Sequence, residues 1–225
     1  MNTLLLLLLA ILPGLVIALF IYYKDSKEPE PYGLLMLSVL YGVFAFFISR
    51  GIGFLLHNYM FSGEGNIAQQ VTKAFFMVGL LSEGFKFLFL RGFTFYYKNF
   101  NQPFDGIVYA IMVGIGFATA ENILYIMNGD PKPDLWPLVT SVPANTVFAV
   151  IMGFFLGEAK LFTNRTLLYS ALALLLASFV HGFYDYLFYL THIKWLWVQA
   201  LISLTIIVVL VQYARKLRKD SVISS

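Results

Sequence analysis

Polar side chains, most of them ionisable, inside long apolar segments are the most informative feature of this sequence. Three short motifs carry them: S-E-G-F-K at 82–86, F-A-T-A-E-N at 117–122 and H-G-F-Y-D at 181–185. A carboxylate or ammonium at bilayer depth costs at least ~2.5 kcal/mol on insertion scales, so such groups face a polar interior and usually have a function there. The six side chains are those of Glu83, Lys86, Glu121, Asn122, His181 and Asp185.

The first motif places a carboxylate and an ammonium three residues apart. Glu83 and Lys86 therefore lie on one face of a helix and can pair. One interpretation is a structural ion pair that neutralises itself inside a helix bundle. The other is functional: Glu83 acts on a water molecule or a metal ion, and Lys86 tunes its charge.

The other two motifs favour a site over a purely structural role. His181 and Asp185 are four residues apart, so the carboxylate can orient the imidazole as a base or a metal ligand, or bind a metal itself. A buried Glu121 needs a proton or a partner. A structural role is easier for Asn122, whose amide can bond to the backbone of a neighbouring helix.

Composition identifies an integral membrane protein. Of the 225 residues, 60% are hydrophobic and 12% are charged, whereas soluble domains are about 25% charged. The chain has no cysteine, which excludes disulfides, thiolate metal sites and cysteine nucleophiles. G-x-S-x-G, H-E-x-x-H and phosphate-binding loops are absent, and no basic patch suited to nucleic acid occurs outside the apolar segments.

The elements that must position these residues are membrane-spanning helices, because about 20 apolar residues cross a hydrocarbon core. We expect an all-α, polytopic bundle that forms a single membrane domain over residues 1–225. Seven segments are long and apolar enough to span: Thr3–Tyr23, Tyr32–Leu56, Ile67–Leu90, Asp105–Met127, Leu135–Ala159, Thr166–Leu190 and Trp195–Ala214.

Charged residues in the loops predict the orientation. With the N-terminus outside, ten Lys and Arg residues fall on the inner side and two, Lys132 and Lys194, on the outer side. This bias favours an external N-terminus and a cytoplasmic C-terminus. The inner residues are Lys24, Lys27, Arg91, Lys98, Lys160, Arg165, Arg215, Lys216, Arg218 and Lys219.

Several motifs together resemble the PrsW family of intramembrane proteases, which is related to the type II CAAX prenyl endopeptidases. They cover about half of the chain in the family's order. The motifs are E-P-E-P at 28–31, S-E-G-F-K-F-L-F-L-R at 82–91, P-F-D-G-I-V-Y-A at 103–110, G-F-A-T-A-E-N-I-L-Y at 116–125, V-P-A-N-T-V-F-A-V-I-M-G at 142–153 and H-G-F-Y-D at 181–185.

Two positions depart from the family pattern. The first motif usually reads E-E-x-x-K, but Ser82 replaces one glutamate here, and Asn145 stands where the family usually has a histidine. Serine cannot act as a carboxylate base, and a neutral amide oxygen is a poor zinc ligand. Either the site is reorganised around Glu83, Glu121 and His181, or the protein is a catalytically inactive relative.

The resemblance implies a metal-dependent endopeptidase of the bacterial plasma membrane. It would make a first cut in a single-pass membrane substrate, such as an anti-sigma factor, on the extracytoplasmic side. His181, with Glu121 or Asp185, would hold a divalent metal, expected to be Zn²⁺. Glu83 would be the base for a metal-bound water, and Lys86 would steady Glu83 or the oxyanion.

Two other classes of function remain open at this stage. An inactive PrsW-like scaffold would use the same cavity to bind transmembrane helices, and the substitutions at Ser82 and Asn145 motivate it. A small transporter or channel would also place ionisable residues in the membrane. It ranks last, because the sequence has neither an internal repeat nor paired broken helices.

Overall fold

A computed structural model of the chain describes residues 3–24, 29–60, 67–128 and 135–190, and these residues contain helices and no strand. The all-α prediction is therefore confirmed for this part of the chain. The five long helices are α1 (Thr3–Lys24), α2 (Tyr32–Met60), α5 (Pro103–Met127), α6 (Leu135–Leu161) and α7 (Thr166–Leu190).

A sixth helical stretch lies between α2 and α5 and changes its winding along its length. It consists of α3 (Ile67–Thr72), a π-helix (Lys73–Leu80) and α4 (Leu81–Gly92), which follow one another without a break. Short 3₁₀ turns at Thr94–Tyr96 and Thr163–Arg165 precede α5 and α7. π-helical turns are rare and frequently occur at functional sites.

Five helices in the described residues are long and apolar enough to cross a membrane, namely α1, α2, α5, α6 and α7. They correspond to five of the seven predicted spans. The third predicted span is helical but is not among these five, and the seventh, Trp195–Ala214, lies outside the described residues. The count of seven is thus not confirmed, and the orientation of the termini stays a prediction.

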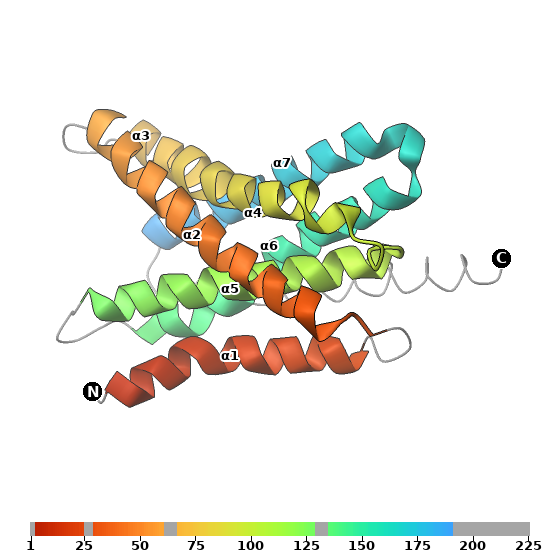
Figure 1. Cartoon of the computed structure of the whole chain (residues 1–225). Helices are drawn as coiled ribbons and strands as arrows, with labels where there is room; N and C mark the ends of the chain where they lie inside the picture. The colour runs from red at the N-terminus through yellow and green to blue at the C-terminus, as the bar shows by residue number, and fades with distance from the viewer. Residues whose placement is uncertain (1–2, 25–28, 61–66, 129–134, 191–225) are drawn as a thin grey trace.

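The centre of the bundle is α5, which is buried along most of its length. Helix α6 lies against it, α2 crosses it obliquely, and α1 runs along the other side of α5 and α6 (Figure 1). The chain starts α5 with a capping box, in which the Asp105 carboxylate accepts hydrogen bonds from the backbone N–H groups of Asn101 and Gln102. These bonds satisfy donors that a helix start leaves unpaired.

Glycines allow the helices to approach closely at their crossings. A Cβ atom at Gly116 would collide with the backbone of Val39 on α2, and one at Gly106 would collide with the backbone of Gly153 on α6. In a membrane, small residues at such contacts supply packing that the hydrophobic effect cannot. Gly116 therefore allows the close crossing of α2 and α5.

Candidate functional site

The π-helix and α4 lie against α7, and this contact brings the first and third motifs together. A Cβ atom at Gly79 would collide with the backbone of Ser178 and Gly182, and a Cβ atom at Gly182 would meet Phe75. The two backbones are therefore as close as glycine permits. Glu83 follows Gly79 by about one turn, so this contact sets its position relative to His181.

Glu83 is fully buried and pairs with two groups through one oxygen. Its Oε1 atom lies 2.6 Å from Nζ of Lys86 and 2.7 Å from Nδ1 of His181. The (i, i+3) pair predicted from the sequence thus forms, and it also includes the histidine of α7. The other oxygen, Oε2, is buried and has no hydrogen-bond partner in the described part of the chain.

Lys86 connects α4 to α6. Its ammonium donates to Oδ1 of Asn145 at 2.6 Å, and it lies 4.2 Å from the centre of the Phe117 ring. Only 1% of the Lys86 surface is exposed. The amide of Asn145 is oriented in turn, because its Nδ2 atom donates to the backbone carbonyl of Ser141. The buried ammonium is stabilised here because two oxygens accept its hydrogen bonds and the face of the Phe117 ring attracts a cation.

The imidazole of His181 is fixed on two sides. It stacks on the Phe148 ring of α6 with 4.3 Å between centroids and 16° between planes. Since the carboxylate of Glu83 can only accept, Nδ1 of His181 is the donor in their contact, which we assign from the hydrogen-bond network. In the neutral ring, Nε2 is then without a proton.

The two polar residues of the second motif, Glu121 and Asn122, bond to α6 and not to Glu83 or His181. The carboxylate of Glu121 accepts a hydrogen bond of 2.7 Å from the Ser141 hydroxyl, and the amide of Asn122 donates to the backbone carbonyl of Leu138 at 3.1 Å. The structural role considered for Asn122 therefore matches its contact. Asp185 is partly buried on α7 and lies within electrostatic reach of His181, Glu121 and Lys86.

The structure thus brings Glu83, Lys86, Asn145 and His181 into direct contact, while Glu121, Asn122 and Asp185 lie outside that group. We call the four contacting residues the polar centre. Ser82 is buried on α4 next to Glu83. The roles that the sequence assigned to these residues, as base, metal ligand or support, stay predictions.

A metal ion does not fit the described residues in this arrangement. No three His, Asp or Glu side chains among them are close enough together to hold one. The ammonium of Lys86 lies between the carboxylate of Glu83 and the amide oxygen of Asn145, which are two of the oxygens that a cation would use. We therefore assign no reaction step to a metal.

Sequence reasoning missed the two aromatic rings and the serine that contact the residues of these motifs. Phe117 and Phe148 contact Lys86 and His181. The Ser141 hydroxyl donates to Glu121, outside the polar centre, and the Ser141 backbone carbonyl accepts from Asn145. One signal was present: Ser141 and Phe148 lie four residues before and three after Asn145, on the same face of the helix. The ring of Phe117 was indistinguishable from the other phenylalanines of an apolar helix.

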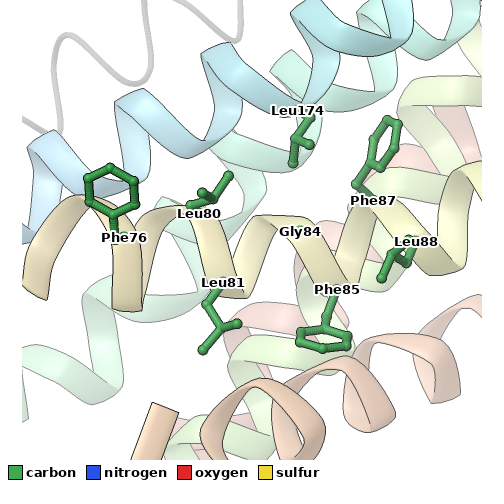
Figure 2. Close-up of a pocket in the computed structure, with 8 residues that line it drawn as sticks. All are labelled: Phe76, Leu80, Leu81, Gly84, Phe85, Phe87, Leu88 and Leu174. Carbon is green, nitrogen blue, oxygen red and sulfur yellow. The ribbon is translucent and has the colours of Figure 1, made fainter. Parts of the chain in front are cut away.

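An apolar pocket of about 340 Å³ adjoins this region. Figure 2 shows its lining, which comes from the π-helix, α4 and one leucine of α7. Gly84, which follows Glu83 in the chain, forms part of the wall, and a Cβ atom there would meet nothing within 4 Å. The lining residues are Phe76, Leu80, Leu81, Gly84, Phe85, Phe87, Leu88 and Leu174.

The sequence of this chain is similar to one family of known proteins. The family model described as PrsW family intramembrane metalloprotease matches residues 30–213. The chain is 34% identical over 175 residues to Protease PrsW of Geobacillus kaustophilus, covering 78% of this chain and 76% of that protein. It is 30% identical over 178 residues to Protease PrsW of Bacillus subtilis, covering 79% of each. No solved structure gives a significant match.

Proposed function

Because this chain belongs to the PrsW family of intramembrane metalloproteases, we propose that it is an endopeptidase that cuts a membrane-anchored protein at the polar centre. The protein is integral to the membrane, with five candidate spans in its described residues. Its relatives come from bacteria, which supports the bacterial plasma membrane as its location.

The free oxygen of Glu83 is the observation that carries this proposal. Oε1 is already engaged by Lys86 and His181, whereas the buried Oε2 has no hydrogen-bond partner among the described residues. An unpaired buried carboxylate oxygen is costly, so its retention needs a reason. A role as general base would explain the unpaired oxygen, since a base must keep one oxygen available for the proton of a water molecule.

The proposed reaction uses that oxygen in both of its proton transfers. Water donates a hydrogen bond to Oε2 of Glu83, which takes the proton as the water oxygen attacks the carbonyl carbon of the substrate. A tetrahedral intermediate forms with a negative charge on the former carbonyl oxygen. The C–N bond then breaks, and Glu83 returns the proton to the leaving amine.

The other residues of the polar centre would position the base. Lys86 balances the charge of Glu83 inside the bundle, and His181 fixes the carboxylate plane through Nδ1. Asn145 acts through Lys86, whose ammonium it holds from α6. Of the two roles predicted for Lys86, steadying Glu83 fits these contacts better than binding the oxyanion, because its donors are already engaged.

The proposed reaction does not use the metal expected from the resemblance. His181 with Glu121 or Asp185 would be its ligands, and Zn²⁺ is the ion that these types of ligand favour. In the present arrangement Glu121 is engaged by Ser141 and no three-ligand group forms among the described residues.

The proposed substrate is a single-pass membrane protein, such as an anti-sigma factor, cut on the extracytoplasmic side. A transmembrane segment is apolar, and the pocket next to α4 offers an apolar surface one residue away from Glu83. Since Glu83 and Lys86 are buried, the substrate backbone has to separate α4 from its neighbours before it reaches Oε2.

The test is cleavage of a single-pass reporter by the full-length protein in liposomes. We expect the wild type to cut the reporter and Glu83→Gln to lose at least about 100-fold in rate, as removal of a general base usually costs. Glu158→Gln is the matched control: Glu158 is also a buried glutamate of the bundle, but it lies on α6 outside the polar centre. Its activity should match that of the wild type.

The inactive scaffold makes a different prediction for the same experiment. A scaffold would retain the reporter on the wild type without cutting it, and Glu83→Gln would bind as well. Cleavage that survives Glu83→Gln would show that another group is the base.

A further inference from the structure

The ammonium of Lys86 has the surroundings of a bound cation. Two oxygens, Oε1 of Glu83 and Oδ1 of Asn145, lie 2.6 Å from Nζ, and the face of the Phe117 ring lies 4.2 Å away. An ammonium has three N–H donors, and here two oxygens and one ring face receive them. The cation is therefore fully engaged by the protein, with 1% of the residue exposed.

The same atoms are the ones that a divalent metal would use at this position. A carboxylate oxygen and an amide oxygen lie on either side of Nζ, and the imidazole of His181 contacts the same Oε1 atom. Carboxylate and carbonyl oxygens suit Mn²⁺, and an imidazole beside a carboxylate can also bind Zn²⁺. A metal bound by Glu83 and Asn145 would have to lie where the ammonium now lies.

Charge makes the two cations mutually exclusive. The carboxylate of Glu83 is already balanced by Lys86. A divalent ion beside a retained ammonium would place two cations within a few ångströms of each other in a buried environment, where like charges repel strongly. The acidic groups that face the centre from neighbouring positions are Asp185 and Glu121, and Glu121 is held by Ser141.

We infer that Lys86 is the resident cation of the polar centre: its ammonium occupies the position between Glu83 and Asn145 that a divalent metal would otherwise take, and it excludes the metal from these residues. The inference concerns the same residues as the proposed function but does not depend on proteolysis. It also accounts for Asn145, whose neutral oxygen is a poor zinc ligand but a good acceptor for an ammonium.

Metal binding by the full-length protein in detergent tests the inference. The probes are Zn²⁺ and Mn²⁺, each supplied alone, followed by removal of excess metal and elemental analysis. The wild type should retain neither ion in stoichiometric amount. Lys86→Leu removes the ammonium and leaves both oxygens and the imidazole, so it should retain about one ion per chain.

Three further variants make the result specific. Lys86→Arg keeps a cation and should stay free of metal. Lys86→Leu combined with His181→Ala should lose the metal that Lys86→Leu gains, which places the ion at this centre. Lys86→Gln serves as the second neutral variant where Lys86→Leu does not fold, which a thermal unfolding curve of each protein reports.

Two outcomes would overturn the inference. One is a wild type that holds about one ion per chain and loses it in His181→Ala, because the metal would then coexist with Lys86. The other is a folded neutral variant that binds no more metal than the wild type. Neither outcome bears on cleavage of the reporter, so failure of this inference and failure of the proposed function are distinguishable.

Discussion

Glu83 and His181 lie 98 residues apart in the sequence, and their Oε1 and Nδ1 atoms are 2.7 Å apart in the structure. This contact joins α4 to α7 and makes the two motifs one centre. The two oxygens of the carboxylate therefore differ. Oε1 is bound by His181 and Lys86, while Oε2 has no hydrogen-bond partner among the described residues. A carboxylate with both oxygens engaged would be a poorer base.

Replacing His181 tests whether it positions Glu83. His181→Ala removes the donor to Oε1, so kcat should fall by roughly 100-fold while KM changes little. His181→Asn is the matched variant, since its amide nitrogen can take the place of Nδ1, and it should recover part of the lost rate. His181→Gln extends past that position and should not. Initial rates on the single-pass reporter give both constants.

A different pattern would assign His181 another role. Recovery of the rate in His181→Gln but not in His181→Asn would mean that Nε2, rather than Nδ1, carries the function. A rise in KM at constant kcat would mean that His181 contacts the substrate directly.

The close contact between Gly79 and α7 should be sensitive to one added methyl group. In Gly79→Ala the new Cβ atom would collide with the backbone of Ser178 and Gly182, and backbone cannot yield as a flexible side chain can. We expect a loss of about 1–3 kcal/mol in stability, typical of overpacking, together with reduced cleavage because Glu83 moves away from His181. Thermal unfolding in detergent and the reporter assay measure the two effects.

Gly51→Ala is the control for this variant. Gly51 is also a helical glycine, on α2, and a Cβ atom there would meet nothing within 4 Å. Alanine favours a helix over glycine, so Gly51→Ala should be neutral or slightly stabilising. Equal behaviour of the two variants would show that the π-helix is not held by close packing on α7.

Sequence reasoning identified the residues of the centre more easily than their partners. Charged groups in an apolar helix stand out, and a spacing of three predicts the Glu83–Lys86 pair, which the structure contains. The departure from the family pattern at Asn145 also singled out a residue that contacts Lys86. These features depend on residue type and short spacings, so they can be read from the sequence without the structure.

Contacts between residues of different helices could not be predicted from the sequence. The spacing of His181 and Asp185 predicted that they act together, but it could not show that His181 contacts Glu83 of α4. The π-helix and the close backbone contact at Gly182 both lie at this helix crossing, and no local pattern in the sequence indicated either of them. The start of α5 was placed to within two residues, because Pro103 and Asp105 are strong local signals.

A second buried pair, at the start of α2, joins the E-P-E-P motif to the central helix. The Tyr109 hydroxyl of α5 donates to Glu30, and both residues are buried. Tyr109→Phe removes this donor from a buried carboxylate and should lower the free energy of unfolding by about 1–3 kcal/mol. Tyr23→Phe, at an exposed tyrosine, should change it little. A Tyr109→Phe protein as stable as the wild type would mean that Glu30 relies on its other contacts.

The orientation predicted from Lys and Arg can be tested with single cysteines, because the chain has none of its own. Asn99 and Asn128 are exposed residues at opposite ends of α5, one just before its start and one at its C-cap. An external N-terminus puts Asn99 on the cytoplasmic side and Asn128 outside.

In intact cells a membrane-impermeant maleimide should therefore label Asn128→Cys and spare Asn99→Cys, and lysis should expose both. The opposite labelling pattern would mean that the orientation in the membrane is the reverse of the predicted one. The direction matters for the proposed function, because Glu121 lies nearer the Asn128 end of α5 than the Asn99 end, and Ser141 joins it to the helix that carries Asn145. Labelling of Asn128→Cys from outside would thus support cleavage toward the extracytoplasmic face, and labelling of Asn99→Cys would move the proposed cut to the cytoplasmic side.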